Sequence, residues 1–517
     1  MIFPPIKEEG TPGQMNLAKV LERNAHEFPD RTSIICRGSK ITYRELNETV
    51  NRVCHALVSL GVKKGDRIGF MLPRIPELVI GFLAVAKAQA IAVPLNYELQ
   101  KEKIRDILAE TSPHCLILHS QFTEIASGAV PRNAEIPFIC TGQVDARADY
   151  SLEKILKDMR SDNPLSPAHE NDVVYLNYTS GSTGNPKGAV TTHANIYWNT
   201  IGAIDALHLS ADDIHLCMFA PFAHPHEIFA RPLLLGGTMV LMEKVYPKSI
   251  AETISTHGVT CMMGLAPLYQ TLLELLDHKT YDLGSLRVPE SGGMYTRVEL
   301  IERFRRKTGV PIIPVWGSTE TTGIAIANRP GDPLPSGSVG KPCCSYEVRI
   351  IDEHNRELPA GEIGEMIFKG PAVVEDYYQR PDENQRCFQN GWYYSGDFGK
   401  RDNAGNLYFI ERKSGMMKVA GLKVYPMEVE LSLIEHPAIQ EVAIIAARDR
   451  LRGEVPKAII VPKPGQQITE KEVYEFCREK LPHYKVPRII EFREHLPKIG
   501  SGKINKRELQ LEEISKP

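Results

Sequence analysis

YTSGSTGNPKG, residues 178–188, is the stretch on which the interpretation of this chain depends. From Thr179 onward it follows the run DVVYLNY, residues 172–178, that predicts a β-strand. Its glycines at 181, 184 and 188 allow positive φ angles, so successive backbone N–H groups can point at one anion. Hydroxyl donors and one lysine add to this composition: Thr179, Ser180, Ser182, Thr183 and Lys187. The stretch predicts a phosphate-binding loop, although a flexible Ser/Gly linker has a similar composition.

The stretch does not match the Walker A loop of kinases and other NTPases. That pattern, G-x-x-x-x-G-K-[ST], places a glycine before the lysine and a hydroxyl residue after it. Here Pro186 precedes Lys187 and Gly188 follows it. A P-loop kinase or NTPase is therefore excluded, and the rest of the chain must identify the loop.

Length and composition limit the class of protein. A chain of 517 residues predicts at least two domains. A net charge of -3 gives no reason to expect nucleic-acid binding. The ten cysteines form no C-x-x-C pair, which argues against a thiolate zinc site and a disulfide framework. Without a signal-peptide pattern or a long apolar run, we expect a cytoplasmic protein with no integral membrane association.

Hydrophobic periodicity predicts an α/β fold. Residues 65–72 and 90–96 read as strands, and residues 73–89 between them read as a helix with Pro76 in its first turn. Such a βαβ unit implies a parallel sheet. After Val339 the alternation of apolar and polar residues predicts antiparallel strands or a small β-barrel, and the last hundred or so residues predict a small α+β domain. We place the domains at 1–413 and 414–517.

The stretch 178–188 also resembles the signature of the acyl-adenylate-forming superfamily, which includes acyl-CoA synthetases, peptide-synthetase adenylation domains and luciferases. The resemblance runs from ITYRELNETVNRV (41–53) to LPKIGSGKINKREL (496–509), with the motifs in family order. It implies ATP and Mg²⁺ as cofactors. The implied phosphate-binding residues in this loop are Thr179, Ser180, Gly181, Ser182, Thr183, Gly184 and Lys187, with Thr183 among the catalytic residues.

Two further motifs resemble nucleotide-binding parts of the family. VWGSTETT (315–322) is similar to the Tyr-Gly-x-Thr-Glu motif, with Trp316 in place of tyrosine. The resemblance implies that Thr319 contacts phosphate and Glu320 holds Mg²⁺, beside Gly317 and Ser318. SGGMY (291–295) resembles the turn against adenine and the acyl pocket, which implicates Gly292, Gly293, Met294 and Tyr295. Taken alone, STE fits an N-capping box that opens a helix, and SGG fits an ordinary β-turn.

The later motifs complete the implied nucleotide site. GWYYSGDFGKRD (391–402) resembles the motif whose aspartate, here Asp397, binds both ribose hydroxyls. Arg412 matches an arginine that contacts ribose or phosphate. Lys418 matches a residue that contacts phosphate. Lys503 matches the catalytic lysine, whose charge would stabilise the attack of the carboxylate on the α-phosphate.

The acid is expected to be a simple carboxylic acid. His224 in APFAHPHEI (220–228) lies where many acyl-CoA synthetases have a histidine near the acyl pocket. No aspartate stands there to pair with the ammonium of an amino acid, and the sequence after His226 does not complete the H-E-x-x-H metal motif. With Gly292, Tyr295 and Gly317, His224 suggests a mostly apolar pocket for a fatty, cyclic or aromatic acid.

The resemblance implies two half-reactions: formation of an acyl-adenylate and pyrophosphate, then displacement of AMP by the thiol of CoA. The small C-terminal domain of the family is mobile and rotates between them, which places Gly421 and Lys423 on the side where the thiol enters. The hinge residue, usually Asp or Lys, is Ser414 here. We expect an AMP-forming acyl-CoA ligase.

Other functions stay open at this point. An amide synthetase with an amine acceptor, or a ligase for an acyl-carrier protein, would keep the same adenylation residues. A luciferase-type oxygenase shares them too. A nucleotide-binding sensor or scaffold without ligase activity would be expected to lose Glu320 or Lys503, and both are present. The sequence does not indicate the oligomeric state.

Overall fold

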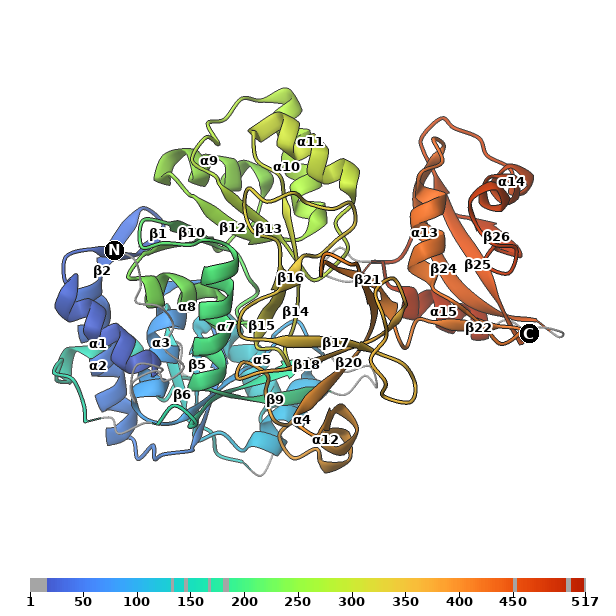
Figure 1. Cartoon of the computed structure of the whole chain (residues 1–517). Helices are drawn as coiled ribbons and strands as arrows, with labels where there is room; N and C mark the ends of the chain where they lie inside the picture. The colour runs from blue at the N-terminus through green and yellow to red at the C-terminus, as the bar shows by residue number, and fades with distance from the viewer. Residues whose placement is uncertain are drawn as a thin grey trace. The chain divides into compact units, whose positions relative to one another are not determined.

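The computed structural model describes residues 16–131, 134–143, 147–165, 169–179, 186–449, 453–498 and 504–515 (Figure 1). The chain divides into two compact units. The first is Met1–Val348 with Phe368–Tyr394, and the second is Arg349–Ile367 with Ser395–Pro517. Each unit is thus built from two separate segments of the chain. The domain boundary at 413/414 stays a prediction. The predicted α/β class, with parallel sheets and a C-terminal α+β domain, is confirmed.

The first unit contains a seven-stranded sheet of order β7-β6-β5-β3-β4-β8-β9. Its strands are β3 (Arg67–Met71), β4 (Ile91–Pro94), β5 (Cys115–His119), β6 (Phe138–Thr141), β7 (Tyr150–Ser151), β8 (Val173–Thr179) and β9 (Lys187–Thr192). The predicted βαβ unit is present: α3 (Pro76–Lys87) connects β3 to β4, which pair in parallel with Arg67 opposite Ile91. Pro76 occupies the first turn, where its missing N–H costs no hydrogen bond.

A nine-stranded sheet of order β16-β15-β14-β13-β12-β10-β11-β1-β2 lies in the same unit. Its strands are β1 (Thr32–Cys36), β2 (Ser39–Thr42), β10 (Ile214–Cys217), β11 (Thr238–Leu241), β12 (Cys261–Gly264), β13 (Val288–Ser291), β14 (Ile313–Ser318), β15 (Gly323–Ala327) and β16 (Lys341–Pro342). The strands from β14 to β1 in this order pair in parallel. Their carboxyl ends therefore share one edge, where α/β proteins bind ligands.

Helices cover both sheets. They are α1 (Leu17–Glu27), α2 (Tyr43–Ser59), α4 (Lys101–Thr111), the 3₁₀ turn η1 (Ser120–Phe122), α5 (Thr123–Ala129), α6 (Leu152–Asp158), α7 (His193–Ala206), α8 (His226–Leu235), α9 (Pro247–His257), α10 (Ala266–His278) and α11 (Val298–Thr308). The helices α9, α10 and α11 lie side by side beside β12 and β13 (Figure 1), and their apolar faces form one buried core that includes Met262 of β12. None of the described helices is long and apolar enough to cross a bilayer.

The strands β17 (Glu347–Ile351), β18 (Gly364–Lys369), β19 (Phe388–Gln389), β20 (Trp392–Arg401) and β21 (Leu407–Arg412) follow Val339. In the first unit α12 (Pro381–Cys387) leads into β19, which pairs antiparallel with the start of β20. In the second unit the end of β20 pairs antiparallel with β21.

The rest of the second unit is an α+β fold. Its strands are β22 (Met417–Val419), β23 (Leu422–Val424), β24 (Ile439–Asp449), β25 (Gly453–Pro462) and β26 (Ile489–Phe492), and its helices are α13 (Pro426–Ile434), α14 (Glu470–Lys480) and α15 (Lys506–Ile514). A buried core that includes Val429, Ile444 and Val473 joins α13 and α14 to this sheet.

Candidate active site

Six of the predicted site residues lie outside the described residues: Ser180, Gly181, Ser182, Thr183, Gly184 and Lys503. The residues on either side of this glycine-rich segment lie on paired strands. Thr179 ends β8 and Lys187 begins β9, and they stand opposite each other in the antiparallel pair. The strand predicted before the loop is thus confirmed, and Lys187 is the part of the loop whose contacts the structure describes.

Lys187 is a buried cation. Its side chain is 7% exposed, and its ammonium forms an ion pair with the Glu383 carboxylate of α12. The ammonium also lies 5.4 Å from the centre of the Tyr377 ring, a distance at which a cation is attracted by the ring face. Sequence reasoning identified the lysine and missed both partners.

Glu320 lies in the turn between β14 and β15, not at the start of a helix as the N-capping alternative would require. Ser318 N donates to Thr321 Oγ1 at 2.9 Å, and Thr322 has a left-handed φ of 55°, so the chain reverses here. The buried carboxylate of Glu320 accepts a hydrogen bond from the Tyr377 hydroxyl at 2.6 Å. Proximity to this carboxylate and burial both raise the pKa of Tyr377, with burial the larger cause. The tyrosine therefore remains a hydrogen-bond donor.

Two predicted motifs meet at one edge of the nine-stranded sheet. SGGMY continues from the end of β13 and GSTE from the end of β14, and these strands are parallel neighbours. Gly292 packs closely against two side chains, because a Cβ there would lie 2.7 Å from Met263 Cε and 3.0 Å from Val315 Cγ2. Gly293 has a positive φ of 73°, as a tight turn requires.

The aromatic ring of Trp316 stacks on Phe368, with centroids 4.3 Å apart and an interplanar angle of 4°. Gly317 lies where a Cβ would be 2.2 Å from the carbonyl oxygen of Gly323, which excludes any larger residue. Met294 packs against the buried core formed with α9, α10 and α11. Burial raises the pKa of the neighbouring Tyr295. Thr319 is buried beside Glu320.

His224 lies beside a buried polar network that the sequence did not reveal, with its ring centre 6.2 Å from that of His226. Its Nδ1 is buried without a hydrogen-bond partner, and burial lowers its pKa. The Nδ1 atom of His226 forms a hydrogen bond of 2.6 Å with the Tyr175 hydroxyl. Behind them Arg231 forms ion pairs with Glu227 at 2.7 Å and with Glu290 at 2.8 Å. Among the described residues there is no group of three or more His, Cys, Asp or Glu side chains that could hold a metal ion.

The second unit brings Asp397 and Arg412 together. They stand opposite each other on β20 and β21, and Arg412 Nε lies 2.8 Å from Asp397 Oδ1. Asp397 is 2% exposed, whereas the Arg412 side chain is 62% exposed. Glu365 accepts a hydrogen bond from the backbone N–H of Gly396 at 3.1 Å, which fixes the backbone of β20 directly before the aspartate.

Three more predicted residues lie on the β22–β23 hairpin. Lys418 and Lys423 are a directly opposed pair, and Gly421 in the turn has a φ of 85°. Lys423 Nζ lies 6.0 Å from the centre of the Phe398 ring. Both lysines are exposed, which suits residues that contact a ligand charge rather than a protein partner.

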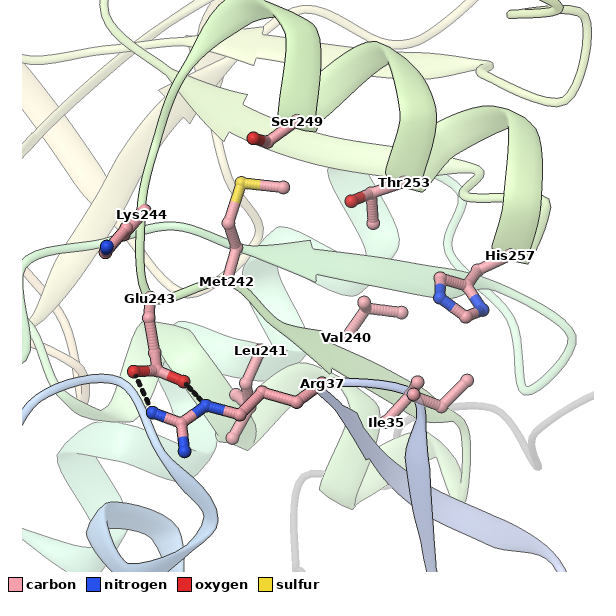
Figure 2. Close-up of a pocket in the computed structure, with 11 residues that line it drawn as sticks. Ile35, Arg37, Val240, Leu241, Met242, Glu243, Lys244, Ser249, Thr253 and His257 are labelled. Atoms are coloured by element: carbon pink, nitrogen blue, oxygen red, sulfur yellow. Dashed lines mark hydrogen bonds and ion pairs between the residues drawn. The ribbon is translucent and has the colours of Figure 1, made fainter.

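A separate pocket of about 520 Å³ opens beside α9 (Figure 2). Ser249, Thr253 and His257 line its helical wall, and Ile35 and Val240 line the strand wall. None of the predicted site residues contributes to it.

Comparisons with known proteins identify the family. Residues 21–378 match the family model of the AMP-binding enzyme, and residues 428–503 match the AMP-binding enzyme C-terminal domain. The first match spans more than half of the chain, so the chain belongs to the AMP-binding enzyme family.

Relatives that match along almost the whole chain support this family membership. A feruloyl-CoA synthase of Amycolatopsis sp is 32% identical over 94% of this chain and 97% of its own. A long-chain-fatty-acid–CoA ligase of Bacillus subtilis is 31% identical over 96% of this chain and 94% of its own. Among solved structures, the anthranilate CoA ligase AuaEII in complex with anthranoyl-AMP has a TM-score of 0.87 at 31% identity and covers 96% of this chain and 97% of its own. ATP-bound MatB from Rhodopseudomonas palustris has a TM-score of 0.88 at 26% identity, with 96% and 98% covered.

The predicted membership of the adenylate-forming enzymes is confirmed, and so is the predicted class, an AMP-forming acyl-CoA ligase. The roles of single residues stay predictions. Sequence reasoning missed Tyr377, Glu383, Arg231 and Glu290, which reach the site only through tertiary packing.

Proposed function

We propose that this enzyme activates a fatty, cyclic or aromatic carboxylic acid with ATP and Mg²⁺ and transfers the acyl group to CoA. The main support is the shared edge of the parallel neighbours β13 and β14, whose carboxyl ends lead directly into Gly292 and into the turn that carries Glu320. Feruloyl and long-chain fatty acids, named in two relatives, suggest the class of acid. Near His224 the carboxylate of Glu227 is already paired with Arg231, which makes it less suited to bind the ammonium of an amino acid.

The proposed reaction has two steps. A carboxylate oxygen attacks the α-phosphorus of ATP, the bond to pyrophosphate breaks, and an acyl-adenylate forms. The CoA sulfur then attacks the acyl carbon, its proton is lost, and AMP leaves with the former carboxylate oxygen. The protein has little covalent chemistry to do, so positioning and electrostatics supply most of the rate, of which positioning alone contributes about 7–11 kcal/mol in favourable cases.

The phosphates would be bound by the backbone and hydroxyl groups of 179–184, by Lys187 and by Thr319. Asp397 would accept hydrogen bonds from the ribose, with Arg412 beside it, and Gly292 to Met294 would lie against the base. The exposed Lys418 and Lys423 are suited to phosphate and thiol-side contacts. Lys503 would act in the first half-reaction only.

Glu320 fits a magnesium ligand. Mg²⁺ is commonly held by one or two carboxylates together with substrate phosphates and water, so a single buried carboxylate oriented by Tyr377 is sufficient. The ion supplies positive charge that offsets the charge of the phosphates.

A panel of carboxylic acids tests the proposed function. Purified enzyme is incubated with ATP, Mg²⁺ and single fatty, cyclic and aromatic acids, with and without CoA, and products are identified by mass spectrometry. We expect AMP, pyrophosphate and an acyl-CoA for at least one acid. AMP release that is the same with and without CoA would instead indicate an amine or carrier-protein acceptor.

A further inference from the structure

Glu383 is a carboxylate placed against a predicted phosphate-binding lysine. Its side chain is 20% exposed, and it pairs with the ammonium of Lys187, whose side chain is 7% exposed. Arg386, the other cation near Glu383, lies 4.0 Å away and is 65% exposed. Lys187 is therefore the main partner that holds this carboxylate.

The pair is held by the surrounding fold and not by its own attraction alone. Asn384, the next residue of α12, accepts a hydrogen bond from Tyr377 N at 2.7 Å and donates to Tyr377 O at 2.9 Å. On the other side Tyr378 N donates to Gly188 O at 2.7 Å. These contacts fix α12 next to the start of β9. Contacts to the backbone therefore hold the segments that carry Glu383 and Lys187 next to each other.

Tyr377 connects this pair to the predicted magnesium ligand. Its hydroxyl donates to Glu320, and its ring lies beside the Lys187 ammonium. A triphosphate that reaches Lys187 would therefore meet two carboxylates and one ammonium. A magnesium ion at Glu320 offsets one carboxylate, whereas the charge of Glu383 opposes the phosphates directly.

We propose that Glu383 is a positioning residue that competes with the phosphates of the nucleotide for Lys187. It keeps the buried ammonium paired and lowers the affinity for ATP, and it takes the lysine back when pyrophosphate leaves. This inference rests on the proposed function, because it assumes that Lys187 binds phosphate. It concerns α12, which lies beyond the residues matched by the family model.

The test uses the full chain and direct binding. Calorimetry measures the affinity of Glu383→Gln for ATP with Mg²⁺, for pyrophosphate with Mg²⁺ and for adenosine. We expect ATP and pyrophosphate to bind about three- to tenfold more tightly than to the unsubstituted enzyme, with adenosine unchanged. In turnover, the KM for ATP should fall by a similar factor. Asp382→Asn, which removes the exposed neighbouring carboxylate of the same helix, is the matched control and should change none of these values.

Two further variants separate competition from a structural role. Glu383→Asp keeps the charge and should bind ATP like the unsubstituted enzyme. In a Lys187→Gln background, the gain from Glu383→Gln should shrink, because the ammonium for which the two anions compete is gone. Weaker ATP binding in Glu383→Gln, or altered adenosine binding, would overturn the proposal by showing that Glu383 holds the site in shape. Failure of the unsubstituted enzyme to bind ATP would refute the proposed function itself.

Discussion

The hydroxyl of Tyr377 donates a hydrogen bond of 2.6 Å to Oε1 of Glu320, although 57 residues separate them in sequence. A buried carboxylate that is to hold a metal must point in one direction, and a donor on one oxygen leaves the other free to bind. Tyr377 also borders Lys187, so one ring positions both the predicted metal ligand and the predicted phosphate ligand.

Tyr377→Phe should weaken the response to magnesium. Loss of a hydrogen-bond donor to a metal-binding carboxylate typically costs about 10–100-fold in metal affinity. We expect the Mg²⁺ concentration at half-maximal rate to rise about tenfold at saturating ATP. Tyr378→Phe is the control, since it removes the adjacent hydroxyl without touching Glu320. An unchanged Mg²⁺ response in Tyr377→Phe would contradict the positioning role.

The Asp397 carboxylate can be tested with modified nucleotides. If it accepts hydrogen bonds from both ribose hydroxyls, 2′-deoxy-ATP and 3′-deoxy-ATP should each bind more weakly to the unsubstituted enzyme, by about tenfold for a hydrogen bond to a charged group. In Asp397→Asn these penalties should largely disappear while ATP itself binds more weakly. Equal deoxy penalties in both proteins would show that Asp397 does not contact the ribose.

Gly317→Ala should damage the β14–β15 turn. The new methyl carbon would lie 2.2 Å from the Gly323 carbonyl oxygen, and backbone on both strands would have to move. We expect the free energy of unfolding to fall by about 2–4 kcal/mol, with loss of activity because Glu320 lies in this turn. Gly128→Ala in α5 is the comparison, because its Cβ meets only the flexible end of Lys101. Similar denaturant midpoints for the two variants would contradict this interpretation.

Acid should destabilise the enzyme through buried histidines. Burial lowers the pKa of His193 and His226 to about 4 and that of His215 to about 3. Their unfolded pKa is about 6.5, so their contribution to stability is complete above pH 6.5 and is lost as the pH falls toward 4. The pKa of the Glu290 carboxyl is raised to about 7, mainly by burial. Its contribution to the free energy of unfolding is therefore present at low pH and is lost as the pH rises toward 7, opposite to that of the histidines.

The difference between variants isolates one histidine. His193→Asn should reduce the loss of unfolding free energy per pH unit by up to about 1.4 kcal/mol between pH 6.5 and 4, as measured by urea denaturation. His278→Asn, at the exposed end of α10, should leave that slope unchanged. Identical slopes in His193→Asn and the unsubstituted protein would show that His193 does not take up its proton on unfolding.

Lys503→Ala should separate the two half-reactions. We expect adenylate formation from acid and ATP to be abolished, while a preformed acyl-adenylate still reacts with CoA at a largely unchanged rate. Equal loss of both half-reactions would contradict the assignment of Lys503 to the first one only.

Local sequence signals predicted the parts of the fold that depend on local physics. The β3–α3–β4 unit followed from apolar spacing and Pro76, and the SGGMY and GSTE motifs were placed by their family order. The N-capping alternative for STE was wrong, because Thr322 and Gly323 both adopt positive φ and turn the chain into β15. The apolar run GIAIA (323–327) after this turn is typical of a strand, and it could have excluded the helix that an N-cap requires.

The supporting side chains could not be predicted in this way. Arg231 on α8 reaches Glu290 on β13 across 59 residues, and Glu383 reaches Lys187 across an even longer separation. Nothing in the local sequence of a surface-type residue such as Glu383 indicates that it will be paired in the interior. Such pairs depend on how helices pack against the sheets, which no short motif encodes.

The origin of the oxygen in AMP tests the central claim most directly. The enzyme is given an accepted acid labelled with ¹⁸O in both carboxylate oxygens, together with ATP, Mg²⁺ and CoA, and the AMP is analysed by mass spectrometry. Attack of the carboxylate on the α-phosphorus predicts one ¹⁸O atom in the phosphate of AMP and none in pyrophosphate. Label in orthophosphate or pyrophosphate, or unlabelled AMP beside labelled acyl-CoA, would contradict an acyl-adenylate intermediate.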